Sequence, residues 1–254
     1  MSRPVLEVSN LGIDFGGLTA VNNLNLELNE HEIVGLIGPN GAGKTTVFNM
    51  LTKVYEPSRG KILLDGKDIE KMNTVEVNKA GVARTFQNIR LFANLSVIDN
   101  VKAGMNNHCV YSVFDTLLHT RKRNDSEKAI NEKAEELLKI FNLYENRNIT
   151  ASSLPYGAQR RLEIARALAT EPKVLLLDEP AAGMNPQETD ELMNTIRFVR
   201  DKFNICILLI EHDMSLVMNI CERIYVLNYG TLLAKGSPDE IKNDERVIKA
   251  YLGD

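Results

Sequence analysis

The sequence predicts an α/β fold whose core is a mostly parallel, buried sheet. Two continuous apolar runs, 174–177 and 205–210, have the length and composition of strands that are covered on both faces. A helix-compatible segment follows each run, at 188–203 and 214–220. Strands that alternate with helices are typical of parallel sheets, because the chain must cross back before the next strand begins. The 254 residues are enough for one sizeable core.

A second part of the chain predicts antiparallel strands. Residues 24–28 alternate apolar and polar side chains, as a half-buried strand does. Residues 61–64 run into the pair Asp65–Gly66, a strong signal for a tight turn. Residues 5–15 read as another strand near the N-terminus. We therefore expect an antiparallel β subdomain beside the parallel core.

The third part is helical and interrupts the sheet-forming segments. Residues 127–141 place their apolar side chains on one face of a helix. We expect an inserted α-helical subdomain at about 88–153 and a helical C-terminal tail at about 238–254. The sequence contains no internal repeat and no low-complexity segment, and residues 1–254 are predicted to form one domain.

Composition excludes several classes of protein. Hydrophobic content of 44% and charged content of 25% are ordinary for a globular protein. The net charge of −4 gives no overall basicity, so we expect no nucleic-acid partner. The N-terminus lacks the apolar segment of a signal peptide, and no apolar run is long enough to cross a bilayer. Any membrane role should therefore be peripheral.

A phosphate-binding loop is the strongest local pattern. The spacing Gly-x4-Gly-Lys-Thr begins after the apolar run 33–37 and ends before the helix-compatible run 47–51. This strand–loop–helix setting is the one in which the motif binds phosphate. Glycines let the backbone curl until N–H groups point at the anion, and the first turn of the helix adds its unpaired N–H groups. The loop residues predicted to bind the nucleotide are Gly38, Pro39, Asn40, Gly41, Ala42, Gly43, Lys44, Thr45 and Thr46.

Side chains of the loop and of the next buried strand supply the chemistry. Lys44 offers a mobile charge to the outer phosphates, and the Thr45 hydroxyl can hold Mg²⁺. Asp178 and Glu179 follow the run 174–177, at the edge of a parallel sheet where ligands bind. Asp178 would reach Mg²⁺ through water, and Glu179 would take the proton of the attacking water. A solvated turn is the alternative for these two acids, and the phosphate loop upstream argues against it.

Two further polar residues follow predicted strands. His212 comes directly after 205–210 and Glu211, so its imidazole would lie near the γ-phosphate and could hydrogen-bond it. Gln87 follows 82–86 and could bind Mg²⁺ or the attacking water. A histidine after a strand is more often structural when it stands alone. Here it accompanies two other nucleotide signals.

These residues resemble the ATP-binding cassette (ABC) ATPases of transporters, and the resemblance extends over nearly the whole chain. Residues 38–46 are similar to the Walker A loop of that family, 175–179 to its Walker B strand, Gln87 to its Q-loop glutamine and His212 to its switch histidine. The resemblance implies that Phe15 stacks on adenine. It also implies a P-loop NTPase (RecA-like) core that carries the antiparallel β and the helical subdomains.

The stretch before residue 159 is similar to the signature motif of the family, which usually reads Leu-Ser-Gly-Gly-Gln. The residues that align with its beginning are Leu154, Pro155, Tyr156 and Gly157. The Tyr-Gly form and the continuation 159–166 resemble the ATPases of branched-chain amino acid importers, as does the ending 250–253. In the family, the signature binds the ATP that the partner subunit holds, and its serine offers a hydroxyl to the γ-phosphate.

Pro155 has neither a hydroxyl nor an N–H group to offer to phosphate. It suits the first position of a helix, and phosphate contact would then fall to the N–H groups of Gly157 and its neighbours. We therefore expect the site formed by this signature to be weaker than one with serine. After Gln87, Leu91 and Phe92 lie where the family contacts a membrane subunit, although they could equally pack inside the helical subdomain.

The resemblance implies an ATPase that uses ATP and Mg²⁺ and works at the cytoplasmic face of the plasma (inner) membrane. Its implied partners are two membrane permease subunits, a second ATPase subunit and, indirectly, a substrate-binding protein. The second ATPase subunit could be a copy of this chain or a related chain. Nothing in the sequence specifies the transported substrate, because in the family it touches the other subunits.

Three other functions remain as alternatives. An ABC exporter ATPase, such as that of lipopolysaccharide transport, has a similar cassette and tail but usually keeps the signature serine. A soluble ABC ATPase without a transport role generally carries two cassettes or long insertions, and 254 residues hold one cassette. A P-loop kinase of another family would lack His212 and the stretch 154–166.

Overall fold

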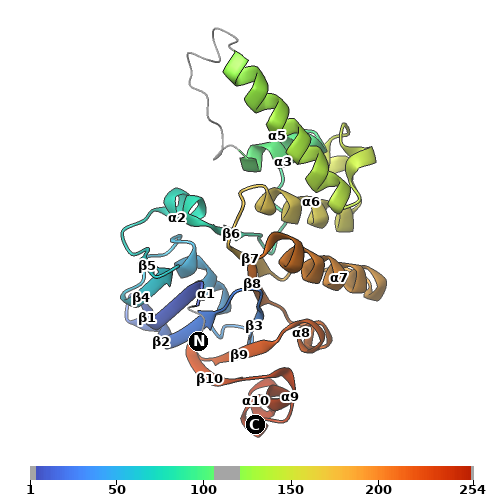
Figure 1. The fold of residues 1–254 in the computed structure, drawn as a ribbon. Coiled ribbons are helices and arrows are strands. Elements are labelled where there is room, and N and C mark those ends of the chain that lie inside the picture. Colours follow the sequence, from blue (N-terminus) through green and yellow to red (C-terminus); the bar gives the residue numbers. More distant parts are fainter. Residues whose placement is uncertain (1–3, 106–120, 253–254) are drawn as a thin grey trace. The chain divides into compact units, whose positions relative to one another are not determined.

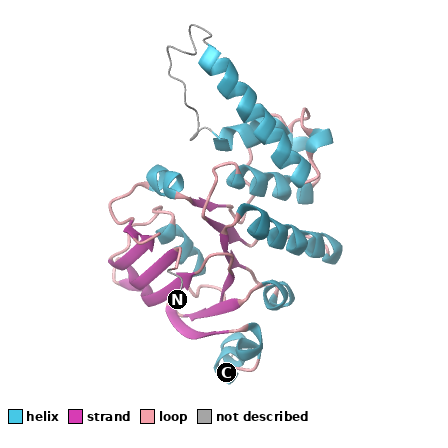
Figure 2. Cartoon of the chain, in the orientation of Figure 1, coloured by secondary structure: helices cyan, strands magenta, loops and turns pink. Residues whose placement is uncertain are grey.

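The computed structural model describes residues 4–105 and 121–252, which divide into two compact units (Figure 1). The first unit contains residues 4–87 and 173–252, and the second contains the described residues between 88 and 172. Both sheets belong to the first unit, and the described elements of the second unit are helical (Figure 2). The expected parallel core, antiparallel β subdomain and helical insertion are therefore present.

A six-stranded sheet forms the core of the first unit, in the order β10-β9-β3-β8-β7-β6. Its strands are β3 (Ile33–Ile37), β6 (Val82–Arg84), β7 (Val174–Asp178), β8 (Cys206–Ile210), β9 (Arg223–Asn228) and β10 (Thr231–Gly236). Neighbouring strands are parallel except β9 and β10, which form a hairpin. Every residue of β3, β7 and β8 is buried, as the continuous apolar runs predict.

The parallel arrangement brings four strand ends to one edge of this sheet. The phosphate loop follows β3, Gln87 follows β6, Glu179 follows β7 and His212 follows β8. Because parallel strands share a direction, the segments after their carboxyl ends lie on the same side. The topology therefore gathers the residues predicted to act on the nucleotide.

An antiparallel sheet with the order β2-β1-β4-β5 forms the other layer of the first unit. Its strands are β1 (Leu6–Phe15), β2 (Leu18–Leu28), β4 (Arg59–Leu64) and β5 (Lys67–Asp68). We expected β2 to begin near residue 24, but it pairs with β1 from Leu18 onward. Register shifts between β1 and β2 break the alternation of buried and exposed side chains in this part, so the sequence pattern did not reveal it.

Helix α1 (Lys44–Leu51) belongs to the hydrophobic core that the two sheets share. Its buried side chains Val47, Phe48 and Met50 pack in the same cluster as apolar residues of β1, β2, β3 and β8. The other helices of this unit are α2 (Thr74–Ala80), α7 (Pro186–Phe203), α8 (Met214–Ile220), α9 (Pro238–Lys242) and α10 (Glu245–Leu252). The last two form the expected C-terminal tail.

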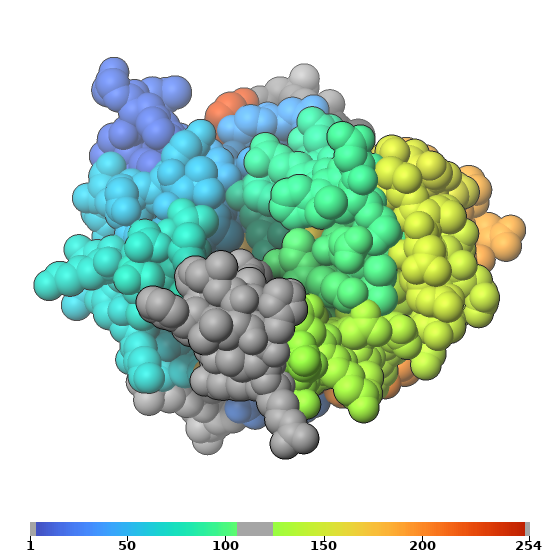
Figure 3. Space-filling model, turned by 90° about the horizontal axis from the view of Figure 1, so that it is seen from above, coloured from blue at the N-terminus to red at the C-terminus, as the bar shows by residue number. Residues whose placement is uncertain are grey.

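The second unit contains α3 (Val97–Gly104), α5 (Arg121–Ile140) and α6 (Tyr156–Leu168), with short 3₁₀ turns at Tyr144–Asn146 and Ala151–Ser153. We expected the helical subdomain to end near residue 153, but the unit continues to 172 because α6 packs against α3 and α5. The approach is close at Gly104, where an added Cβ would lie 2.4 Å from the carbonyl oxygen of Arg166. In the space-filling view, residues of this unit (green to yellow) lie next to one another on the visible face (Figure 3).

Helices that could span a membrane are absent from residues 4–105 and 121–252, since none of the described helices is both long and apolar enough.

Candidate nucleotide-binding site

The loop after β3 adopts the curled backbone that its glycines predict. Gly38, Gly41 and Gly43 have φ values of 150°, 79° and 100°, which side chains rarely tolerate. A Cβ on Gly38 would lie 2.1 Å from the carbonyl oxygen of Leu227, and one on Gly43 would lie 2.9 Å from that of Ala20. Neighbouring backbone therefore occupies the space of a side chain at both positions, which makes glycine necessary there.

Lys44 lies inside this loop. Its Nζ donates hydrogen bonds to the carbonyl oxygens of Gly38 at 2.6 Å and Pro39 at 3.0 Å. Burial lowers the pKa of Lys44, and the carboxylates of Glu179 and Asp178 oppose that shift. The buried ammonium group of Lys44 is thus hydrogen-bonded to carbonyl groups of its own loop. A phosphate group is a stronger acceptor because it is charged, and it can replace these carbonyl groups as the partner of Lys44.

Helix α1 begins directly after the loop without a side-chain cap. Its N-cap residue is Gly43 in the left-handed conformation, and no side chain accepts a hydrogen bond from the first turn. The unpaired N–H groups and the positive end of the helix dipole are therefore available to an anion. Thr45 and Thr46, both in this first turn, line the adjoining pocket.

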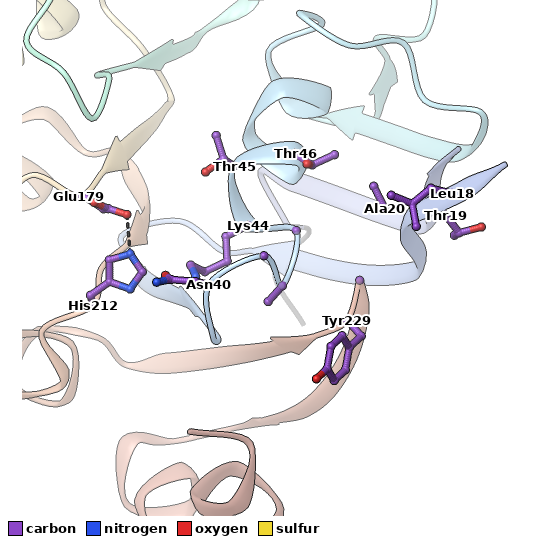
Figure 4. Close-up of a pocket in the computed structure, with 14 residues that line it drawn as sticks. Leu18, Thr19, Ala20, Asn40, Lys44, Thr45, Thr46, Glu179, His212 and Tyr229 are labelled. Atoms are coloured by element: carbon purple, nitrogen blue, oxygen red, sulfur yellow. Dashed lines mark hydrogen bonds and ion pairs between the residues drawn. The ribbon is translucent and has the colours of Figure 1, made fainter. Parts of the chain in front are cut away.

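The loop opens into a pocket of about 420 Å³ (Figure 4). Residues 40–46 line it together with Glu179 and His212 at one end, and with Leu18 and Tyr229 at the other (Figure 4). One end is thus polar and titratable, while the other carries an aliphatic and an aromatic side chain. This division matches the two halves of a nucleotide, a charged phosphate chain and a flat, less polar nucleoside.

Glu179 is the centre of a hydrogen-bond cluster at the polar end. Its Oε1 lies 2.6 Å from Nε2 of His212, and its Oε2 accepts a hydrogen bond of 2.7 Å from Nε2 of Gln87. Its backbone is in the left-handed region, with φ of 46°, which is strained for a residue other than glycine. Gln87 and His212, both predicted to act beside Glu179 on the nucleotide, therefore each contact Glu179 in this structure.

Asp178 has a partner that the sequence reasoning missed. Its carboxylate forms a buried ion pair with Arg84, whose Nη2 lies 2.7 Å from Oδ2. The other Nη of Arg84 donates to Oδ1 of Asn49 at 2.6 Å, and its guanidinium lies over the ring of Phe48. A charged residue within an otherwise apolar strand was the signal that could have identified Arg84, because buried arginines require an anionic partner.

Glu211 was also missed. It is buried, and its two oxygens accept hydrogen bonds from the backbone N–H groups of Ala181 at 2.7 Å and His212 at 3.1 Å. Burial raises the pKa of this carboxyl, and the N–H groups that it accepts from oppose the shift. Glu211 thus ties the segment after Glu179 to the segment that carries His212. The sequence shows that Glu211 directly precedes His212, but it does not show that the Glu211 side chain is buried.

The set of possible magnesium ligands is small and made of oxygens. No cluster of three or more histidine, cysteine, aspartate or glutamate side chains is present in the described part of the chain. The hydroxyl of Thr45, the amide of Gln87 and the carboxylate of Asp178 suit Mg²⁺, which usually takes one or two protein ligands and completes its shell with water and phosphate. The residues therefore fit a magnesium ion that arrives with a nucleotide.

Phe15, predicted to stack on adenine, is not among the described residues that line the pocket. Its ring packs edge-on against Tyr55, with 5.4 Å between ring centroids and an interplanar angle of 75°. The side chain is 43% exposed, so one surface of it remains open to solvent.

The residues aligned with the signature motif lie in the second unit, at the start of α6. Pro155 is the N-cap of α6 and not its first helical residue, so the predicted position is off by one. Its φ of −57° and ψ of 154° are extended, and its carbonyl accepts the N–H of Gln159 at 2.9 Å. No side chain caps this helix, Tyr156 is half-exposed and Gly157 is buried.

Comparisons with known proteins identify the family and the fold of the chain. The family model described as "ABC transporter" matches residues 21–182, and the model described as "Branched-chain amino acid ATP-binding cassette transporter" matches residues 231–254. The chain is 28% identical to the solved ADP conformation of MJ1267, an ATP-binding cassette of an ABC transporter, with a TM-score of 0.85 and all of both chains covered. The predicted ABC nucleotide-binding fold is confirmed.

Curated relatives match the chain over nearly its whole length. It is 50% identical to the high-affinity branched-chain amino acid transport ATP-binding protein LivG of Escherichia coli and 49% identical to BraF of Pseudomonas aeruginosa, with 100% of each chain covered. It is 36% identical to the lipopolysaccharide export system ATP-binding protein LptB of E. coli, with 98% of this chain and 97% of the relative covered. The chain therefore belongs to the family of ABC transporter ATP-binding proteins.

Proposed function

We propose that this chain is the ATP-hydrolysing subunit of an importer for branched-chain amino acids: leucine, isoleucine and valine. The observation that carries the proposal is its identity of 50% to LivG over the full length of both chains, against 36% to LptB. The match of residues 231–254 to a model for branched-chain amino acid transporters supports it independently of the ATPase core.

Glu179 would be the base that accepts a proton from the attacking water. The proposal is supported by its contacts with His212 and Gln87, which hold both carboxylate oxygens at the polar end of the pocket. His212 would hydrogen-bond the γ-phosphate, and Lys44 would leave its carbonyl partners for the outer phosphates. Thr45, Gln87 and Asp178 would hold Mg²⁺, which would neutralise phosphate charge.

The nucleotide would be enclosed between two ATPase subunits. This is supported by two helices, α1 and α6, that begin without a side-chain cap and so leave N–H groups for phosphate. Residues 38–46 would hold one side of the ATP, and Leu154, Pro155, Tyr156 and Gly157 would contact the ATP of the partner subunit. ATP binding would close the pair and hydrolysis would reopen it.

The remaining partners follow from the importer role. Two permease subunits would lie in the inner membrane, with this chain bound at their cytoplasmic face and a substrate-binding protein on the opposite side. Of the two residues predicted to contact a permease, Phe92 is 52% exposed, whereas Leu91 is partly buried. Leu95, which is 42% exposed, would be a further apolar contact. An exporter of lipopolysaccharide is the second candidate, because LptB is also similar over nearly the whole chain.

Replacing Glu179 with glutamine in the assembled transporter tests the proposal. Wild-type complex in vesicles is expected to take up leucine when MgATP is present on the ATPase side. Glu179→Gln is expected to bind ATP and retain a closed dimer but to lose about 10²–10⁴-fold in hydrolysis, the range for a missing general base. Glu191→Gln, an exposed change on α7, serves as the matched control.

Two results would count against different parts of the proposal. Hydrolysis by Glu179→Gln at the wild-type rate would remove Glu179 from the role of base. ATP-driven activity without uptake of leucine, isoleucine or valine would contradict the assigned substrate, and extraction of lipopolysaccharide from the vesicles would favour the exporter.

A further inference from the structure

Tyr229 is a large side chain that the proposed chemistry does not use. It stands at the tip of the β9–β10 hairpin, and 88% of its surface is exposed. Leu18, at the start of β2, is 69% exposed. These two residues have the highest exposed fractions among the large hydrophobic side chains described, and both line the pocket beside the phosphate loop. Exposed apolar surface concentrated at a pocket is typical of a binding site.

The hairpin tip is fixed to the phosphate loop. The N–H of Gly230 donates to the carbonyl of Ala42 at 3.0 Å, and the carbonyl of Gly230 accepts the N–H of Asn22 at 2.8 Å. A Cβ on Gly230 would lie 2.4 Å from the carbonyl oxygen of Ala20, so the backbones are in close contact. The ring of Tyr229 therefore extends from a hairpin tip whose backbone is hydrogen-bonded both to the phosphate loop and to β2.

The backbone of Tyr229 is strained for its residue type. Tyr229 and Gly230 have φ values of 44° and 75° and form a two-residue hairpin turn between Asn228 and Thr231. Positive φ at both positions defines the turn that favours Asn-Gly or Asp-Gly, and tyrosine is a poor choice for its first residue. Turn formation thus explains Gly230 but not the aromatic ring beside it.

The ring lies at the end of the pocket away from the hydrolytic groups. Figure 4 shows Glu179 and His212 on one side of Lys44, with Tyr229 and Leu18 on the other. If the γ-phosphate lies beside Glu179, the nucleoside extends toward Tyr229 and Leu18. Phe15 packs on Tyr55 outside the residues that line this pocket, so Tyr229 is the aromatic ring already present at this end.

We propose that Tyr229 contacts the ribose and base of the bound nucleotide and thereby raises the affinity for nucleoside triphosphates over that for a bare phosphate chain. This role rests on the proposed function, since it assumes that the phosphates occupy the loop. The phenol ring covers a flat, weakly polar ligand surface, while its hydroxyl can pair with a ribose hydroxyl. Tyr229 is thus a specificity-determining residue of the nucleotide site.

The decisive variant is Tyr229→Asn, because asparagine suits the positive φ of this turn and removes the ring. Binding of MgATP and of magnesium tripolyphosphate is measured by calorimetry on the full chain, with thermal unfolding recorded alongside. Tyr229→Asn is expected to weaken MgATP binding about tenfold, to leave tripolyphosphate binding unchanged and to keep or raise the unfolding temperature. Tyr229→Phe is expected to retain most of the MgATP affinity.

Phe198→Ala is the matched control, since Phe198 is a 48%-exposed aromatic residue of α7 that does not line the pocket. It should leave both affinities unchanged. Equal MgATP affinity in Tyr229→Asn and wild type would overturn the role of Tyr229, as would an equal loss for tripolyphosphate, which would assign the ring to the phosphate loop. Failure of the wild-type chain to bind MgATP would instead refute the proposed function.

Discussion

The first turn of α1 and the first turn of α7 satisfy their backbone N–H groups in different ways. Asn185 caps α7, accepting the N–H of Glu188 at 3.0 Å, and the side chain of Glu188 accepts the N–H of Asn185 at 3.0 Å. At α1 the N-cap is Gly43, and no side chain takes this role. Helices α2, α3, α8 and α9 also have a side-chain cap, through Asn73, Ser96, Asp213 and Ser237, and Asp244 accepts the N–H of Arg246 in the first turn of α10.

Helix α6 resembles α1 and differs from this capped group, because its N-cap Pro155 has no side-chain acceptor. A capped helix has used its N–H groups internally, whereas an uncapped helix leaves them for water or a ligand. Among the α-helices whose N-cap the structure describes, α1 and α6 are the two without a side-chain cap, and they follow the phosphate loop and the signature-like stretch. Helices α1 and α6 thus lack the stabilising side-chain cap at the two positions where the proposed function requires an anion to bind.

The two uncapped helices are not equivalent. Helix α1 carries a buried lysine in its first turn and follows a loop in which neighbouring backbone leaves no room for a side chain at Gly38 and Gly43. Helix α6 begins with Pro155 and the half-exposed Tyr156, and its N-cap Pro155 offers neither a charge nor a hydroxyl group. We therefore expect α1 to supply most of the affinity for ATP and α6 to contribute less.

Among the substitutions that test this difference between α1 and α6, Lys44→Ala should have the largest effect on ATP binding. It removes the cation from the more strongly binding helix end, and hydrogen bonds to charged groups contribute about 1.5–3 kcal/mol each. The dissociation constant for MgATP is expected to rise about 100-fold, measured by calorimetry on the full chain. Lys67→Ala, an exposed change on β5, should leave that constant unchanged. Unaltered ATP retention in Lys44→Ala would contradict the assignment of the loop.

The groups around α1 show what the sequence could predict. The loop motif predicted the curled backbone at Gly38 and Gly43, because only glycine fits there. The positions of Gln87, Glu179 and His212 could be predicted because parallel strands end at one edge, and Glu179 indeed contacts both Gln87 and His212. Local pattern and sheet direction were sufficient for these residues.

Residues that act through distant partners could not be predicted. Arg84 pairs with Asp178, 94 positions along the chain, and Glu211 accepts the N–H of Ala181, 30 positions away. Tyr229 reaches the pocket only because its hairpin bonds to Ala42. Such contacts depend on tertiary packing, and even the charge of Arg84 within an apolar strand indicates only that a partner exists, not which residue it is.

Pro155→Ser should have an intermediate effect, and it acts on the weaker helix end. Serine adds a hydroxyl group at the N-cap. This hydroxyl can accept a backbone N–H of α6 in the free protein and can donate a hydrogen bond to phosphate in the closed dimer. A charge-assisted hydrogen bond of about 1.5–3 kcal/mol predicts ATP-driven dimerisation that is tenfold or more tighter. Sedimentation of the Glu179→Gln background with and without the second change measures this difference.

Pro155→Ala is the control for that experiment, because it removes the proline ring without adding a hydroxyl group. It should not reproduce the gain in dimerisation. If Pro155→Ser leaves both dimerisation and the ATPase rate of the assembled complex unchanged, the signature-like stretch does not contact phosphate through this position.

Asn73→Ala should have the smallest effect, and it tests the capped group. Asn73 accepts the N–H groups of Val75 and Glu76 at 2.9 Å and 3.0 Å, so these two N–H groups of α2 are not open to a ligand. Loss of this cap is expected to cost about 1 kcal/mol and to lower the unfolding temperature by about 2–4 °C, while the MgATP dissociation constant stays the same. A changed ATP affinity would show that capped and uncapped helix ends do not divide structural from binding roles as the comparison requires.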